Sequence, residues 1–140
     1  MASIKDIKKV VAQDEEGAVI PLFQKNGEPY VGLDGEQSTF TVLGSESKQY
    51  RAAKHTHMRK LQKRARGRGG VSEDPKQLER DSRELIAAAV IGFSGWDEGG
   101  KELPFTPENV RMFLDVDHIF EQVNMGVQGH ADFFSQNSGG

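Results

Sequence analysis

The sequence lacks cysteine, and it has no apolar stretch longer than the nine residues 85–93. Without cysteine, a disulfide framework, a thiolate zinc site and a cysteine nucleophile are excluded. The apolar stretch is far shorter than the ~20 residues of a membrane-spanning helix, and the opening MASIKDIKKVV has no apolar core of a signal peptide. For 140 residues we expect one domain, in an intracellular protein that contacts no membrane.

Arrangements that indicate catalysis or a bound cofactor are also missing. Asp97 and Glu98 stand in an expected turn, where carboxylates are common without any chemistry. His55 and His57 lie two residues apart on a predicted helix, so their side chains diverge, and no third metal ligand is evident. The glycines after this helix precede no Gly-Lys-Ser/Thr step, which a phosphate-binding loop requires. We therefore expect no enzyme activity, no metal and no cofactor.

Basic and acidic residues are separated along the chain, whose formal net charge is −3. Residues 45–70 carry nine basic side chains and one acid, Glu46, which gives +8 and leaves −11 for the remainder. Such separation favours contact with an oppositely charged partner or between copies of the chain. Residues 59–68 include six basic side chains but no aromatic ring that could stack on a base. Nucleic acid is therefore not an expected partner.

The N-terminal part predicts a short helix followed by strands. SIKDIKKVV places four apolar residues on one helical stripe, with Ser3 as N-cap. Asn26-Gly27 predicts a hairpin turn in which both residues have positive φ. Pro21 argues that its strand lies at an edge of the sheet, and the alternation in STFTVLG is typical of another strand.

The basic stretch predicts a helix capped by Ser45 or Ser47, with one narrow apolar stripe. We expect the stripe and the basic face to form a surface for a partner or for self-association. Its residues are Tyr50, Met58, Arg59, Lys60, Leu61, Lys63 and Arg64. The alternative is that Tyr50, Met58 and Leu61 fill the core.

Two further helix starts are clear. Asp74 is a predicted N-cap with a proline after it, and the following helix is apolar on nearly every face from Leu85 to Phe93, so we expect it at the centre of the core. A punctuated corner, GWDEGGKELPFTPENV, then leads into the next helix. We expect its structural anchors to be Trp96, Pro104, Phe105, the N-cap Thr106 and the first helical residue Pro107.

These features predict a single α+β domain that is mainly α. A small N-terminal β-hairpin or strand element precedes about four helices, which pack around the central apolar helix. The expected segments are a β element (17–44), a basic helix (45–66), a flexible loop (67–74), a helical core (75–134) and a frayed tail (135–140).

In order and spacing, four stretches resemble the tail assembly chaperones of long-tailed bacteriophages and prophages. The stretches are VIPLFQKNGEPYVG, FTVLGSESKQYRAAKHTHMRKLQKRARG, ELIAAAVIGFSGWDEGGKELPFTPENVRMFLD and IFEQVNMGVQGHADFF. They span residues 19–134, and the punctuated corner is their most specific part.

The resemblance implies a non-enzymatic binding protein of the host cytoplasm. Such chaperones coat the long helical tape-measure protein, keep it soluble and help to recruit tail-tube subunits, and they are typically absent from the finished virion. The alternatives are a structural virion protein, such as a minor tail or head–tail connector subunit, and a small nucleic-acid-binding regulator. Mass spectrometry of purified particles would separate a chaperone from a structural subunit.

Overall fold

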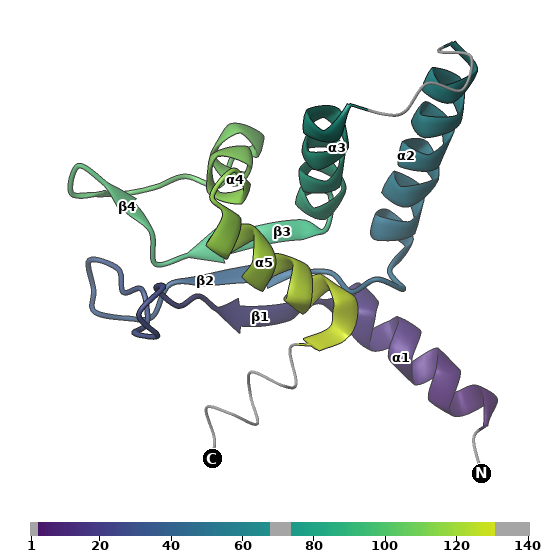
Figure 1. The fold of residues 1–140 in the computed structure, drawn as a ribbon. Helices are drawn as coiled ribbons and strands as arrows, with labels where there is room; N and C mark the ends of the chain where they lie inside the picture. Colours follow the sequence, from purple (N-terminus) through teal and green to yellow (C-terminus); the bar gives the residue numbers. More distant parts are fainter. Residues whose placement is uncertain (1–2, 68–73, 131–140) are drawn as a thin grey trace.

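The computed structural model describes residues 3–67 and 74–130, and it confirms an α+β fold that is mainly α. A helix, α1, precedes the first strand (Figure 1). The elements follow in the order α1 (Ile4–Glu16), β1 (Ala18–Pro21), β2 (Thr39–Val42), α2 (Lys48–Gly67), α3 (Pro75–Ala87), β3 (Val90–Ser94), β4 (Asp97–Glu98), β5 (Lys101–Glu102), α4 (Pro107–Leu114), α5 (Asp117–Met125) and the π-helical turn η1 (Gly126–His130).

Strands β1, β2 and β3 form an antiparallel sheet in that spatial order, so β1 lies at an edge, as Pro21 predicted. Phe40 in β2 pairs with Ile20 on one side and with Phe93 on the other. Because side chains alternate along a strand, Val19 points to the opposite face of the sheet, where it is exposed. Only one face of the sheet therefore contributes to the core.

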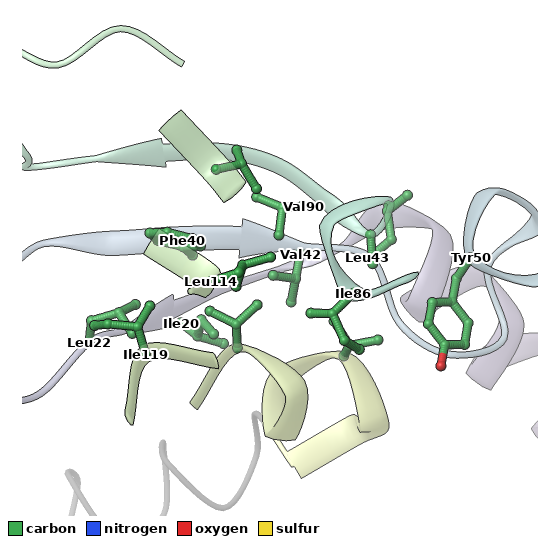
Figure 2. Packing of buried hydrophobic residues seen from close by; sticks show 14 residues of the cluster. Ile20, Leu22, Phe40, Val42, Leu43, Tyr50, Ile86, Val90, Leu114 and Ile119 are labelled. Carbon is green, nitrogen blue, oxygen red and sulfur yellow. The ribbon is translucent and has the colours of Figure 1, made fainter. Parts of the chain in front are cut away.

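The core lies between that face and helices α3, α4 and α5 (Figure 2). Phe40 and Leu22 from the β element are fully buried, as are Leu114 at the end of α4 and Val123 in α5. Gly126 lets the end of α5 approach the sheet, because a Cβ atom there would lie 2.9 Å from Ile20 Cδ1. Contacts between distant parts of the sequence thus define the core.

The prediction of a central helix that continues to Phe93 is wrong for its second half. Helix α3 ends at Ala87, and residues 90–94 form strand β3 instead. Val90 pairs with Val42 and Phe93 pairs with Phe40, so this segment completes the sheet. A short apolar run with β-branched residues and a glycine suits a buried strand as well as a helix, and pairing with β2 decides between them. The expected helical core therefore contains β3, β4 and β5.

The turn at Asn26-Gly27 also differs from the prediction. Gly27 has a φ of +90°, whereas Asn26 does not take a positive φ. The Asn26 side chain instead accepts a hydrogen bond from the Glu28 amide at 2.9 Å, as in an Asx turn. The turn still joins two antiparallel segments, which meet at the Phe23–Pro29 bridge.

The punctuated corner packs on the sheet and α4, and the ring of Trp96 lies 4.6 Å from that of Phe113 in α4. Gly95 makes the turn with a φ of +79°, and a Cβ atom there would lie 2.8 Å from the Ser38 backbone. The predicted N-cap is confirmed, since Thr106 Oγ1 accepts from the Asn109 amide at 3.1 Å. The corner therefore packs on a sheet, because residues 90–94 before it form strand β3 and not the end of the expected central helix.

Two predicted segments fall largely or wholly beyond what the structure describes. Residues 68–73 of the expected loop and residues 135–140 of the expected tail lie outside the described residues. The basic helix begins at Lys48, and the amide of Tyr50 donates to Ser47 Oγ at 3.3 Å. Of the two predicted capping serines, Ser47 is therefore the one in place.

Candidate partner-binding site

Helix α2 forms one side of the molecule, beside α3 (Figure 1). Its 20 residues span about 30 Å, yet Tyr50 is its only fully buried residue. The less exposed positions recur at helical spacing and mark the face that meets α3: Tyr50, Ala53, His57, Leu61 and Arg64. The remaining circumference of α2 is exposed and basic.

The structure separates the predicted binding residues into two groups. Tyr50 belongs to the core, where its hydroxyl accepts from Gln128 Nε2 at 3.2 Å. Leu61 is half-buried on the face toward α3, and Arg64 is ion-paired with Asp81 of that helix. The other predicted residues are exposed on the surface: Met58, Arg59, Lys60 and Lys63. Of the three residues that could alternatively fill the core, Tyr50 does so, while Met58 is exposed and available to a partner.

Asp81 fixes the crossing of α2 and α3. Burial by itself raises the pKa of this carboxyl, but hydrogen bonds from Arg64 and Gln77 outweigh it and hold the pKa below its usual value. The carboxylate is therefore ionised at neutral pH, and it keeps Arg64 turned toward α3. Reversing the charge of Arg64 would break this pair, so the residue is structural rather than free for a partner.

An apolar groove lies between α3 and α4, and we call it the α3–α4 groove. Its volume is about 340 Å³, and it is lined by Glu84, Ala87, Ala88, Val90, Phe105, Pro107, Val110 and Arg111. Phe105, expected to be a structural anchor, is 46 % exposed here, although its ring edge also touches Phe93 at 5.2 Å between centroids. The small side chains of Ala87 and Ala88 leave the space that Phe105 borders.

A second groove adjoins the first across Glu84. It runs between α2 and α3, has a volume of about 200 Å³ and includes Lys60 and His57. At the shared rim, Glu84 lies 3.8 Å from Arg111, and both side chains are exposed, so water screens this pair. The two grooves together form one surface that is apolar in the α3–α4 part and basic toward α2.

Met58 lies in a further hollow on the outer side of α2, with a volume of about 570 Å³. Basic residues line most of it, namely Arg51, Lys54 and Arg59, together with His55, and one acid, Glu46, also lies there. His57 lines the other side of α2, so the two histidines diverge as predicted. An exposed methionine among cations suits an apolar contact framed by acids on the partner.

Over the parts of the chain that the structure describes, no group of three His, Cys, Asp or Glu side chains is placed to hold a metal ion. Within the same residues, no helix is both long and apolar enough to cross a bilayer.

Comparisons with protein-family models, curated proteins and solved structures found no match to this chain. The resemblance to tail assembly chaperones accordingly stays a prediction from the quoted stretches. The α3–α4 groove was not predicted. Its one signal in the sequence was the Ala-Ala-Ala run, which indicates close approach of neighbouring elements, followed by an aromatic residue just before a helix cap.

Proposed function

We propose that this protein is a non-enzymatic tail assembly chaperone that binds amphipathic helices of the tape-measure protein and keeps them soluble. The observation that carries the proposal is the α3–α4 groove, an apolar hollow bordered by the half-exposed Phe105 and joined to a basic helix. The groove supports a binding role. The resemblance alone adds the host cytoplasm, recruitment of tail-tube subunits and absence from the mature virion to the proposal.

The groove suits helix-in-groove recognition. In that mode, an amphipathic helix lays apolar anchors, spaced three or four residues apart, into a hydrophobic hollow. Phe105 offers a rigid apolar wall, and Ala87 and Ala88 leave room for the partner's side chains. A long helical protein that exposes such anchors would aggregate alone, and covering them one site at a time keeps it in solution.

The charges of α2 set the kind of helix that fits. Arg59, Lys60 and Lys63 are exposed, and α2 contains no acid in its first turn. Acidic residues beside the partner's apolar anchors would be attracted to this face, which speeds encounter and fixes the register more than it adds affinity. We therefore expect binding to weaken as salt rises.

Replacing Phe105 tests the groove directly. With the tape-measure protein co-expressed, Phe105→Ser should reduce soluble capture at least tenfold, because it removes the exposed apolar wall of the groove. Met112→Ser is the matched control, since Met112 is a large exposed residue of α4 that does not line the groove. Capture by a folded Phe105→Ser variant equal to that of the control would refute the groove as the binding site.

Reversing exposed charges tests the electrostatic part. The variant Lys60→Glu/Lys63→Glu should lower the association rate about tenfold at low salt, because Lys60 lines the groove beside α3, and the difference should shrink at 0.5 M salt. Arg64 is left intact because it pairs with Asp81. The control reverses Lys25 and Lys101, which are exposed outside α2. An association rate unaffected by the α2 variant would remove the basic face from the proposal.

A further inference from the structure

Leu33 lies at the tip of a tight turn in the β1–β2 connection, where its side chain is 63 % exposed. The Gly35 amide donates to the Gly32 carbonyl at 3.0 Å, so Leu33 and Asp34 are the two central residues of a β-turn. Turns are usually built from glycine, proline and small polar residues. A large apolar side chain at this tip is therefore available for contact with another molecule.

The turn that carries Leu33 is held by several hydrogen bonds. Asp34 Oδ1 accepts from the Glu36 amide at 3.0 Å, and the Gly32 amide donates to the Glu36 carbonyl at 2.9 Å. Gly35 has a φ of +81°, which a residue with a side chain rarely adopts. Because the backbone of the turn is already ordered, a contact made by Leu33 would lose little conformational entropy on binding.

Acidic side chains predominate around this turn. Residues 24–37 and 97–102 together contain six acids and two lysines, and all eight side chains are exposed. The two segments meet at a pocket of about 240 Å³, which is lined by Leu33, Asp34, Gly95, Trp96 and Glu102. An apolar tip thus lies among carboxylates. We call this tip and its acids the acidic knob, which consists of Leu33, Asp34, Glu36 and Glu102.

The hollow on the outer side of α2 has the complementary character. Met58 lines it and is 49 % exposed. Its volume of about 570 Å³ leaves room for a leucine side chain, and a methionine adapts its shape to an apolar group. The charged residues that line it are three cations and one acid, namely Arg51, Lys54, Arg59 and Glu46. An apolar residue framed by acids therefore matches this hollow in both polarity and charge.

The acidic knob and the Met58 hollow lie at opposite ends of the molecule. Figure 1 shows the β1–β2 connection and β4 on one side and α2 on the other. Leu33 therefore does not reach Met58 of its own chain, and the two surfaces can meet only between copies. A contact between two different patches of identical chains is head-to-tail, and it leaves a free knob and a free hollow at the ends of each assembly.

We propose that copies of this chain associate head to tail, with the acidic knob of one copy in the Met58 hollow of the next. A second copy is the occupant because the one chain supplies both complementary surfaces, which attract each other through their opposite charges. A knob in a hollow buries less than the ~1,200 Å² of a standard interface. We therefore expect a weak association that decreases as salt rises.

This contact is independent of the proposed function. Lys60 lines the groove between α2 and α3, whereas Met58 lines the outer hollow. The two residues lie two positions apart on a helix, so their side chains point to opposite sides of α2. Phe105→Ser, which alters the α3–α4 groove, should leave self-association unchanged. The two proposals can therefore fail separately.

Two variants, each altered on one surface only, test the contact by sedimentation velocity at low salt after nuclease treatment. Arg51→Glu/Lys54→Glu alters the hollow, and Glu36→Lys/Glu102→Lys alters the knob, while Asp34 is kept because it holds the turn. The unaltered chain should associate increasingly as its concentration rises. In each variant alone, the dissociation constant of self-association should rise at least tenfold, because attraction at the contact is lost.

An equimolar mixture of the two variants tests the head-to-tail arrangement. Each variant then offers the surface that the other has lost, so the mixture should form pairs with one copy of each and grow no further. A mixture that stays monomeric would overturn the proposal, as would an unaltered chain that stays monomeric at every concentration. Association that disappears on nuclease treatment would overturn it in favour of nucleic acid as the bridge.

Replacing Leu33 tests the apolar part of the contact without changing a charge. Leu33→Ser should weaken self-association at least tenfold, because it removes the side chain that enters the hollow. Val19→Ser is the matched control, since Val19 is 64 % exposed but lies on the open face of the sheet. Self-association of Leu33→Ser as strong as that of the control would refute Leu33 as the occupant of the hollow.

Discussion

Trp96→Ala is expected to lower the free energy of unfolding by about 3–5 kcal/mol, the range for removing a large aromatic side chain from a packed site. The Trp96 ring centroid lies 4.6 Å from that of Phe113, 5.3 Å from that of Tyr30 and 5.9 Å from that of Phe40. These rings come from α4, the β1–β2 connection and β2. One side chain therefore joins three parts of the fold.

The indole also makes a polar contact, because Nε1 donates to the Thr39 carbonyl at 3.2 Å. Alanine would remove this bond as well as three ring pairs, each worth about 0.5–1.5 kcal/mol beyond its buried area. Because Trp96 is partly exposed, the loss of stability should be smaller than for a fully buried tryptophan. The range of about 3–5 kcal/mol includes this reduction. The corner that carries most of the resemblance thus has a structural role.

Urea unfolding followed by far-UV circular dichroism measures this effect without relying on the fluorescence of the only tryptophan. Phe105→Ala is the control within the same corner. It should cost less than about 1 kcal/mol, since Phe105 is 46 % exposed. A Trp96→Ala variant as stable as the control, yet defective in capturing the partner, would make Trp96 a contact residue instead.

Local signals in the sequence predicted those elements whose determinants lie close together in the chain. Thr106 and Pro107 define the start of α4 within four residues, and Asp74 does the same for α3, where its side chain accepts from the Lys76 amide. The edge position of β1 followed from Pro21 alone. Such signals act over one helical turn or one strand, so no tertiary contact is needed to interpret them.

The segment after Ala87 depends on contacts that the local pattern does not contain. Val90 and Phe93 form a strand because β2, about 50 residues earlier in the chain, offers a matching apolar edge. Helical periodicity is satisfied equally well by the same residues. The α3–α4 groove was missed for the same reason, because Phe105 and Ala88 are brought together only by this strand and the turn after it.

Like the α3–α4 groove, the role of Arg83 was not predicted from the sequence. This residue lies on α3, its side chain is only 12 % exposed, and its guanidinium donates to the Leu114 carbonyl at the end of α4. The same group pairs with Asp117 at 2.6 Å at the start of α5, and it lies over the Phe120 ring at 5.2 Å from the centroid. A planar guanidinium can make these contacts at once, whereas an ammonium group cannot.

Arg83→Met is therefore expected to lower the free energy of unfolding by about 3 kcal/mol. The largest part is the carbonyl of Leu114 left without its donor, at about 1–3 kcal/mol, followed by the cation–π contact at about 1 kcal/mol. The ion pair adds less, because Asp117 is 81 % exposed. The stability of Arg83→Lys should lie between that of the unaltered protein and that of Arg83→Met, since lysine keeps the charge but loses the forked geometry of the guanidinium.

Arg80→Met is the matched control, because Arg80 is an exposed arginine on the same helix. Urea unfolding should show a change below about 0.5 kcal/mol for this variant. If Arg83→Met were no less stable than Arg80→Met, the junction of α3, α4 and α5 would be held by its apolar contacts alone. The expected difference instead makes Arg83 the polar link that fixes α4 beside α3, and with it the width of the groove in which we place the partner helix.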